Sequence, residues 1–225
     1  MSDSRLPDYL LRYYRWAYVA PAALRFWDHE GLVDLILFHQ YRRLRDLART
    51  ALRQGPAGDL LQIACVYGSL SACLVDDLAP TARLHVVDVV PEQLRHLAAK
   101  LPAHASVLHR GDSAHLALAD ASFARILIFF LLHEQPAPVR LATLREALRI
   151  LRHGGRLVIV DFHRPAPWHP LRPLQWLIFR LFEPFARELW TAELIPLLQQ
   201  LHPDLRIEQE LICAGLYQRL IIDKP

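Results

Sequence analysis

The stretch that decides the fold is Leu60–Leu70, which reads LLQIACVYGSL. A buried apolar run here leads through a tight turn into a helix expected over residues 69–78, the arrangement found at the ligand-binding edge of nucleotide-binding α/β domains. Such domains carry several glycines in this turn, whereas this chain keeps only Gly68. The stretch predicts an intact α/β scaffold that aims backbone N–H groups at a nucleotide-like ligand, with altered chemistry at the turn.

Strand and helix patterns alternate around this turn. We expect strands over residues 59–64, 83–89, 106–109, 125–132 and 156–162; the last two are nearly continuous apolar runs, as in strands covered on both faces. Further helices are expected over 91–100, 139–151 and 191–201, with Gly154-Gly155 ending the second. Two last β segments, 205–212 and 216–222, resemble the closing antiparallel pair of a seven-stranded sheet. Alternating βα units predict a mostly parallel sheet with helices on both faces.

Aromatic residues set two segments apart from this alternation. All five tryptophans lie outside residues 55–161. An N-terminal segment, 1–54, contains Trp16 and Trp27 and a helix expected over 32–52, and precedes a main domain over 55–225. A second segment, about 164–190, follows the fifth strand and interleaves tryptophans and phenylalanines with arginines. It predicts an amphipathic helical lid at a membrane surface, together with the N-terminal helix; the alternative is a helix packed on its own domain.

Composition narrows the class of protein. A chain of 225 residues with 53% hydrophobic content buries a sizeable core in one domain. A net charge of only +3 argues against a dedicated nucleic-acid partner. The three cysteines fit no metal-binding spacing and indicate reduced thiols in a cytoplasmic protein. No apolar run reaches the ~20 residues of a membrane span, so any membrane contact is expected at the surface, on the inner face.

Two acids stand where a nucleotide would bind in such a sheet. Asp88 ends the second strand about 20 residues beyond the turn, a position suited to accepting hydrogen bonds from ribose hydroxyls. Its alternative role is to cap the helix starting at Pro91. Asp112 follows the third strand beside Ser113 and could address an adenine ring, or could simply be a turn residue.

Four titratable residues follow the fourth and fifth strands. His133 and Glu134 come after the fourth strand; Asp161 and His163 end the fifth, and their i, i+2 spacing points both side chains to one side. Two imidazoles and two carboxylates at neighbouring strand ends predict an oxygen and nitrogen site suited to Mn²⁺. Taken singly, any of the 12 histidines is more often a surface or hydrogen-bonded residue, and Glu134 could be solvated.

Together these spacings resemble a class I S-adenosylmethionine-dependent methyltransferase. The resemblance covers residues 60–161 and includes DASFAR at 120–125 and LRHGGRL at 151–157. It implies a Rossmann-like fold, with the cofactor held by Gln62, Ala64, Cys65, Tyr67, Gly68, Asp88, Val89, Asp112 and Ser113. The family's turn reads acid, x, Gly, x, Gly, x, Gly, and the corresponding residues here are Gln62, Ala64, Val66 and Gly68. Losing the acid removes the usual partner of the cofactor's ammonium group.

Within that superfamily, most of the chain resembles the rhodoquinone biosynthesis proteins. The shared motifs are YYRWAY at 13–18, CVYG at 65–68, LHEQP at 132–136, DFHRP at 161–165, HPLRPL at 169–174 and EPFA at 183–186. The resemblance implies conversion of ubiquinone to rhodoquinone, in which an amino group replaces a ring methoxy group. It also implies that S-adenosylmethionine donates the amino group and that Mn²⁺ is required.

A mechanism follows as a hypothesis. The metal would polarise the quinone oxygens, and the freed methionyl amine would turn toward the ring. A neutral His133 or His163 would take its proton unless it binds the metal, and Tyr67 would contact cofactor or substrate, or pack beneath the turn. Two alternatives remain: a conventional methyltransferase acting on a quinone or another lipid-like acceptor, and a non-catalytic binding protein.

Overall fold

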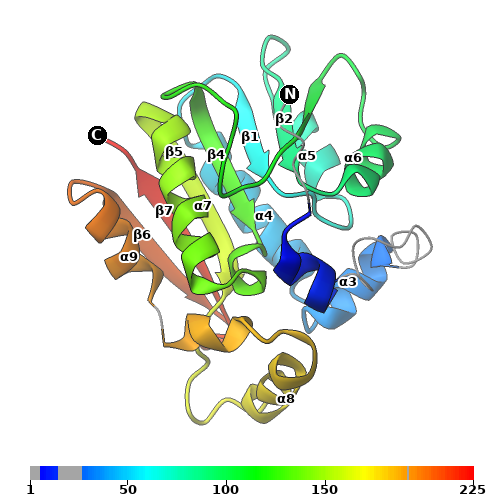
Figure 1. Ribbon diagram of the computed structural model, residues 1–225, viewed down its shortest axis with the longest axis vertical. Coiled ribbons are helices and arrows are strands. Elements are labelled where there is room, and N and C mark those ends of the chain that lie inside the picture. The colour runs from blue at the N-terminus through cyan, green and yellow to red at the C-terminus, as the bar shows by residue number, and fades with distance from the viewer. Residues whose placement is uncertain (1–5, 15–26, 192) are drawn as a thin grey trace.

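A seven-stranded sheet forms the centre of the computed structural model, which describes residues 6–14, 27–191 and 193–225 (Figure 1). The strands are β1 (Leu60–Ile63), β2 (Leu84–Asp88), β3 (Ser106–Arg110), β4 (Phe123–Phe129), β5 (Leu151–Phe162), β6 (Arg206–Ile212) and β7 (Tyr217–Asp223). Their order is β3-β2-β1-β4-β5-β7-β6. The first five pair in parallel, and β7 runs antiparallel to both β5 and β6. The predicted fold class and closing antiparallel pair are confirmed.

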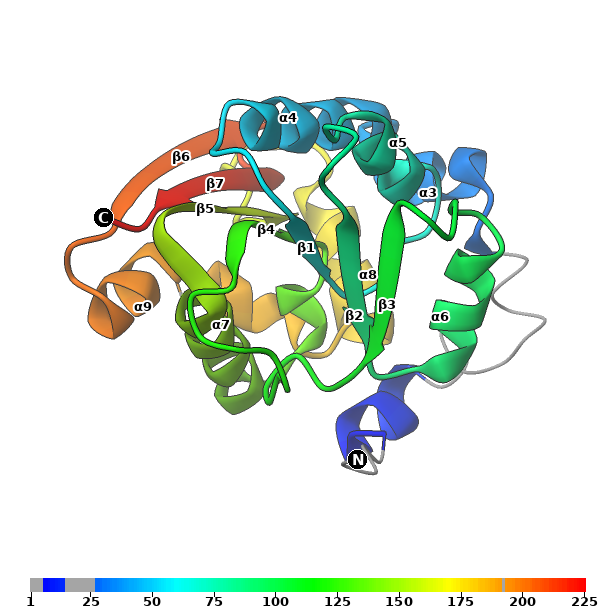
Figure 2. The same cartoon turned by 90° about the horizontal axis from the view of Figure 1, so that it is seen from above.

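Helices cover both faces of the sheet (Figure 2). One face packs against α4 (Tyr41–Arg53), α5 (Leu70–Asp76) and α6 (Pro91–Ala98), and the other against α7 (Ala137–Ile150) and α9 (Leu194–Leu201). Neighbouring strand residues point to opposite faces, so Leu60 joins the first core and Leu61 the second. Burial on both faces explains the continuous apolar runs of the central strands.

The N-terminal segment contributes directly to the main core. Leu44, Ala48 and Ala51 of α4 are fully buried in the cluster that covers the sheet. The single helix expected over residues 32–52 is wrong: α3 (Glu30–Ile36) and α4 are separate. Phe38 and His39 have φ of 49° and 61°, a left-handed conformation that a helix of L-residues does not continue through. Trp16 lies outside the described residues.

Two further expectations about the strands are corrected. The fourth strand was expected to reach residue 132, but β4 ends at Phe129 and Leu132–Glu134 form a 3-10 turn, η2. Gly154-Gly155 was expected to end a helix, but α7 ends at Ile150 and both glycines lie within β5. The pairing of β5 with β4 shifts register between Phe123 and Arg125, which accommodates these extra residues of β5.

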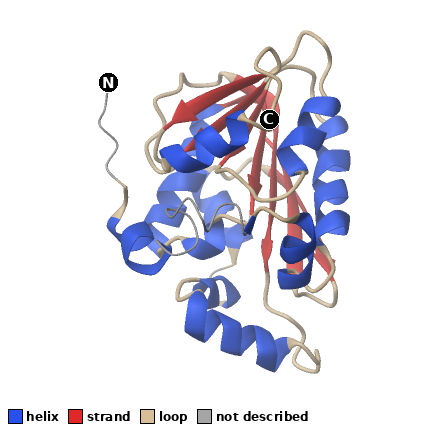
Figure 3. Cartoon of the chain, turned by 90° about the vertical axis from the view of Figure 1, so that its right-hand side faces the viewer, coloured by secondary structure: helices blue, strands red, loops and turns tan. Residues whose placement is uncertain are grey.

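The insertion after the fifth strand folds beyond the carboxyl ends of the parallel strands (Figure 3). It contains α8 (Arg172–Phe182) and the 3-10 helix η3 (Ala186–Trp190). A short π-helix, η1 (Leu10–Tyr14), packs against it through contacts of Tyr9 and Tyr13 with the ring of Phe185. These elements enclose the edge of the sheet where ligands collect in this architecture.

Candidate active site

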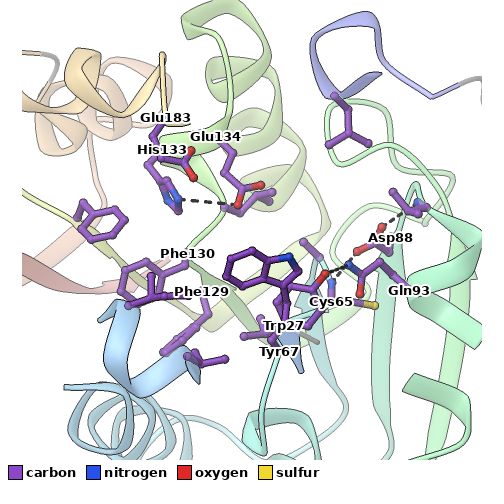
Figure 4. Close-up of a pocket in the computed structure, with 18 of the residues that line it drawn as sticks. Trp27, Cys65, Tyr67, Asp88, Gln93, Phe129, Phe130, His133, Glu134 and Glu183 are labelled. Carbon is purple, nitrogen blue, oxygen red and sulfur yellow. Dashed lines mark hydrogen bonds and ion pairs between the residues drawn. The ribbon is translucent and has the colours of Figure 1, made fainter. Parts of the chain in front are cut away.

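A cavity of about 650 Å³ opens at the carboxyl ends of the parallel strands. Asp88, Cys65 and Gln93 lie on one side of it, and His133, Glu134 and Glu183 on the other (Figure 4). The ring of Trp27 lies between the two groups. Aliphatic and aromatic side chains of α3 and α8 complete the lining; they are Val33, Leu35, Ile36, Ile178, Phe179 and Phe182. The cavity therefore has a region lined by polar groups, next to a region lined by apolar side chains.

The first turn keeps the backbone shape of a glycine turn although two glycines are missing. Ala64 has φ of 72°, a region that favours glycine, and Gly68 has φ of 86°. A Cβ on Gly68 would lie 2.6 Å from the Tyr41 hydroxyl, so only glycine fits there. Gln62 is fully buried: its amide donates to the Ala64 carbonyl at 2.9 Å and accepts from the Ser71 hydroxyl at 2.8 Å. The amide that replaces the family's acid therefore holds the turn together.

Protein side chains already bind the N–H groups at the start of α5. The Tyr41 hydroxyl accepts hydrogen bonds from the backbone N–H groups of Ser69 (2.9 Å) and Leu70 (3.0 Å), and Asp28 accepts from that of Gly68 (2.8 Å). The expectation that these groups point at a ligand is corrected. Gln62 and Gly68 were predicted to bind the cofactor, but neither lines the cavity.

The remaining predicted cofactor residues do line the cavity; they are Ala64, Cys65, Tyr67, Asp88, Val89, Asp112 and Ser113. Asp88 accepts hydrogen bonds from the N–H groups of Cys65 (2.7 Å) and Val90 (2.8 Å), one at each carboxylate oxygen. Asp88 is not the N-cap of α6, because Val90 holds that position, and its bond to the Val90 N–H supports the chain just before the helix.

Asp112 also combines a structural contact with a place in the lining. Its carboxylate accepts a hydrogen bond from the Ala114 N–H at 2.9 Å, as expected of a turn residue. The Ser113 hydroxyl lies 2.9 Å from the Gln135 amide nitrogen and 3.0 Å from the Thr143 hydroxyl. The loop after β3 is therefore fixed against α7.

Three further residues that line the cavity had no site role predicted from the sequence: Tyr9, Trp27 and Gln93. The Gln93 amide donates to the Tyr67 hydroxyl at 3.1 Å. Burial raises the pKa of both Tyr9 and Tyr67, so both phenols stay protonated. Tyr9 and Trp27 belong to the N-terminal segment, and its richness in aromatic residues was the sequence feature that could have indicated a role in the site.

His133 lies against a buried carboxylate. Its Nδ1 lies 2.8 Å from Asp161, which also accepts the backbone N–H groups of Leu132 (2.8 Å) and Phe162 (2.7 Å). Burial lowers the pKa of His133, but the charge and hydrogen bond of Asp161 outweigh it and raise the pKa to about 9. The raised pKa favours the imidazolium form of His133, which can donate a proton. This direction favours a proton donor at His133, where a neutral base was expected.

The predicted four-ligand manganese site is not formed. The Asp161 carboxylate is fully buried and occupied by its three donors. His163 lies against the turn before β7, where its Nδ1 is 3.3 Å from the Gly215 carbonyl oxygen, and it does not line the cavity. No cluster of three or more His, Cys, Asp or Glu side chains within residues 6–14, 27–191 and 193–225 could hold a metal ion. His133 and Glu134 remain in the cavity, with His133 Nε2 3.8 Å from Glu134.

The insertion adds an acid, Glu183, that belongs to a motif noted in the sequence but had no predicted site role. Glu183 lines the cavity and accepts a hydrogen bond from the Tyr14 hydroxyl at 2.7 Å. Burial raises the pKa of Glu183. Arg140 ties this region to η2, because its guanidinium donates to the carbonyl oxygens of Leu132 (2.9 Å), Gln135 (2.8 Å) and Phe185 (3.3 Å). The site is therefore assembled from three distant parts of the chain.

Aromatic rings form one wall beside His133. Phe130 has φ of 53°, a strained value for a non-glycine residue, and its ring meets those of Phe129 and Phe162 edge to face at 5.0 and 5.1 Å. The Phe162 ring lies 4.8 Å from that of His133 and 5.0 Å from that of Phe179. A flat, apolar ring with polar substituents suits such a wall.

Comparison with known proteins agrees with this geometry. Residues 60–155 match the protein family described as a methyltransferase domain. The fold is that of a class I methyltransferase. A solved S-adenosylmethionine-dependent methyltransferase from Aquifex aeolicus superposes with a TM-score of 0.58 at 15% identity, covering 90% of this chain and 97% of that one. At that identity the likeness concerns the fold alone.

Two curated methyltransferases are similar in sequence. A demethylmenaquinone methyltransferase of Beutenbergia cavernae is 33% identical over 150 residues, which cover 66% of this chain and 59% of that protein. A ubiquinone/menaquinone biosynthesis C-methyltransferase of Paracoccus denitrificans is 34% identical over 126 residues, covering 54% and 47%. The matched part thus spans about half to three fifths of these relatives.

Proposed function

We propose that this protein is an S-adenosylmethionine-dependent transferase whose acceptor is a quinone. The observation that carries this proposal is that one cavity is lined both by Asp88 and Asp112 and by the aromatic wall beside His133. Asp88 would hold the ribose and Asp112 the adenine, while the quinone ring would lie against Phe130 and Phe162. The quinone methyltransferases among the relatives support this acceptor class.

His133 would activate the acceptor. As an imidazolium it can donate a hydrogen bond or a proton to a quinone carbonyl oxygen, which makes the ring carbons more electrophilic. Glu134, 3.8 Å from His133 Nε2, is placed to take the proton of an attacking amine. Tyr67 would contact the cofactor through its protonated phenol.

We propose further that the transferred group is the amino group, so that ubiquinone becomes rhodoquinone. The methionyl nitrogen would attack the ring carbon bearing a methoxy group, and that methoxy group would leave as methanol. Loss of the methionyl α-proton would then move two electrons into the ring and give a quinol imine. Water would hydrolyse this imine to the aminoquinol, which is the reduced form of rhodoquinone, and a 2-oxo acid. The support is Gln62: its buried amide is occupied by Ala64 and Ser71, so no carboxylate stands there to hold the ammonium group away from the ring. Methyl transfer to a quinone is the second candidate, favoured by the names of the relatives.

Labelled cofactor separates these reactions. Purified protein would be incubated with ubiquinone, or with a demethylated quinone, and S-adenosylmethionine labelled either in the methionyl nitrogen or in the methyl carbon. Mass spectrometry should find the nitrogen label in the quinone product. Methyl label alone would establish the second candidate, and bound cofactor with no labelled quinone would leave a binding protein.

We also propose that the protein works at the inner membrane face, as a cytoplasmic protein docked on the lipid surface. Beside the cavity, α8 exposes Leu177 (45%), Leu181 (62%) and Phe182 (51%), and α3 exposes Leu35 (58%). Arg180 and Arg187 lie 5.4 and 5.5 Å from the ring of Trp176, where cations meet an interfacial aromatic residue. None of the described helices is long and apolar enough to cross a bilayer. Flotation with anionic vesicles tests the docking.

A further inference from the structure

Gln175 has a buried side-chain amide that stands out from the other buried glutamines. It lies on α8, its residue surface is 1% exposed, and it lines the cavity. Neither its amide nitrogen nor its amide oxygen makes a hydrogen bond within the described part of the chain. Buried amides are nearly always hydrogen-bonded, because an unpaired amide loses its hydrogen bonds with water and gains none in the protein. By contrast, Gln62, Gln93 and Gln218 are buried glutamines whose amides are bonded.

The position of Gln175 on α8 directs it toward the proposed acceptor. The helix lines the cavity with residues spaced three or four apart, as one helical face requires: Gln175, Ile178, Phe179, Phe182 and Glu183. Phe179, one turn beyond Gln175, contacts Phe162, which in turn contacts His133. Gln175 therefore belongs to the same wall as the aromatic residues, with its amide buried just behind the cavity surface.

We propose that Gln175 is a specificity residue that recognises the oxygen-bearing edge of the quinone ring. Its amide nitrogen would donate to a carbonyl oxygen and to the neighbouring methoxy oxygen, and its amide oxygen would accept from the incoming group. This inference rests on the proposed quinone acceptor. The inference adds that α8 contacts the substituents of the quinone ring as well as covering the cavity.

The test compares two buried glutamines. Gln175→Met removes the amide with little change in volume, and Gln218→Met is the matched control, since the Gln218 amide donates to the Phe162 carbonyl oxygen at 3.1 Å. Quenching of tryptophan fluorescence would measure the binding of ubiquinone with a one-isoprene tail, and calorimetry that of S-adenosylmethionine. We expect Gln175→Met to weaken quinone binding about tenfold or more, with cofactor affinity unchanged and Tm equal or higher. Gln218→Met should lower Tm.

The outcomes separate the inference from the function on which it rests. If wild-type protein binds the quinone and Gln175→Met binds it equally well, the inference is wrong and the proposed function stands. A fall in Tm as large as that of Gln218→Met would make Gln175 a structural residue and also overturn the inference. Wild-type protein that binds no quinone would defeat both. Gln175→Glu provides a second variant, because its carboxylate would repel the quinone oxygens and should also weaken binding.

Discussion

Gln62 shows how one side chain can preserve a turn while changing its chemistry. Its amide nitrogen donates to the Ala64 carbonyl and its amide oxygen accepts from Ser71. A glutamate at this position would bring a carboxylate oxygen against the Ala64 carbonyl, two acceptors without a donor. The family's usual acid is therefore incompatible with this hydrogen-bond arrangement.

We expect Gln62→Glu to lower the free energy of unfolding by about 1–3 kcal/mol, the usual cost of a buried polar group that loses its partner. Cofactor affinity should not rise, because the side chain does not line the cavity. Urea denaturation and calorimetry with S-adenosylmethionine measure the two effects. A variant as stable as wild type that binds the cofactor more tightly would place residue 62 in the cofactor site after all.

His133 predicts a dependence of stability on pH. Its pKa is raised to about 9, above the ordinary 6.5, by the buried Asp161 carboxylate. The folded state therefore binds the proton more tightly, and this stabilisation is complete below pH 6.5 and is lost as pH rises through about 9. Its size is about 1–3 kcal/mol.

His133→Gln, which does not titrate, should lack this loss. Urea denaturation from about pH 6 to about pH 10 on both proteins isolates the contribution of His133 as the difference between the two curves. Transferase activity that requires the imidazolium should fall over the same alkaline range. Parallel stability curves for the two proteins would show that His133 is not charged in the folded state.

At the scale of elements, Tyr41 joins the N-terminal segment to the central turn. Its hydroxyl accepts the N–H groups of Ser69 and Leu70 and donates to the Tyr67 carbonyl oxygen at 3.2 Å. A phenol from α4 thus does the work of an N-cap for α5, whose own Ser69 makes no side-chain capping bond. This capping therefore depends on the docking of α4 against the turn.

Tyr41→Phe should lower the free energy of unfolding by about 1–3 kcal/mol, because two buried N–H groups lose their acceptor. Tyr217→Phe is the control: it is equally buried, but its hydroxyl makes one bond, to the Leu37 carbonyl oxygen at 2.9 Å. Denaturation should rank the first loss above the second. Amide hydrogen exchange at residues 69–70 should quicken only in Tyr41→Phe, and unchanged exchange there would contradict the capping role.

At the scale of the whole molecule, the exposed apolar surface is continuous with the cavity lining, because Phe182 of α8 and Leu35 of α3 are exposed and also line the cavity. A membrane-docked enzyme could take a quinone ring from the bilayer while its tail stays in lipid. The quinone ring would then pass from the bilayer along the exposed apolar surface of α8 into the cavity.

Leu181→Glu should reduce flotation with anionic vesicles several-fold, since a carboxylate on this face opposes both apolar burial and the lipid charge. Leu211→Glu is the matched control: Leu211 is also exposed (51%) but lies on the edge strand β6. Both changes are at the surface and should alter stability by less than about 0.5 kcal/mol. Equal flotation of both variants and wild type would remove α8 from the docking surface.

The order and type of the elements could be read from the sequence because burial follows local periodicity. Apolar runs marked β4 and β5, and the alternation of βα units fixed the parallel sheet. Asp88 and His133 could be named as cavity residues because ligands meet strands at their carboxyl ends. These inferences need only neighbours in the chain and the rules of sheet topology.

Tertiary structure alone decided which polar groups are already hydrogen-bonded within the protein. Tyr14 reaches Glu183 across 169 positions, and the Tyr41 hydroxyl occupies N–H groups that the sequence had left for a ligand. Asp161 looked like a metal ligand from its spacing, but backbone donors and His133 occupy it, and His163 turns toward Gly215. Hydrogen bonds between distant segments have no sequence period, so the pairing of each donor and acceptor emerges only when the chain is folded.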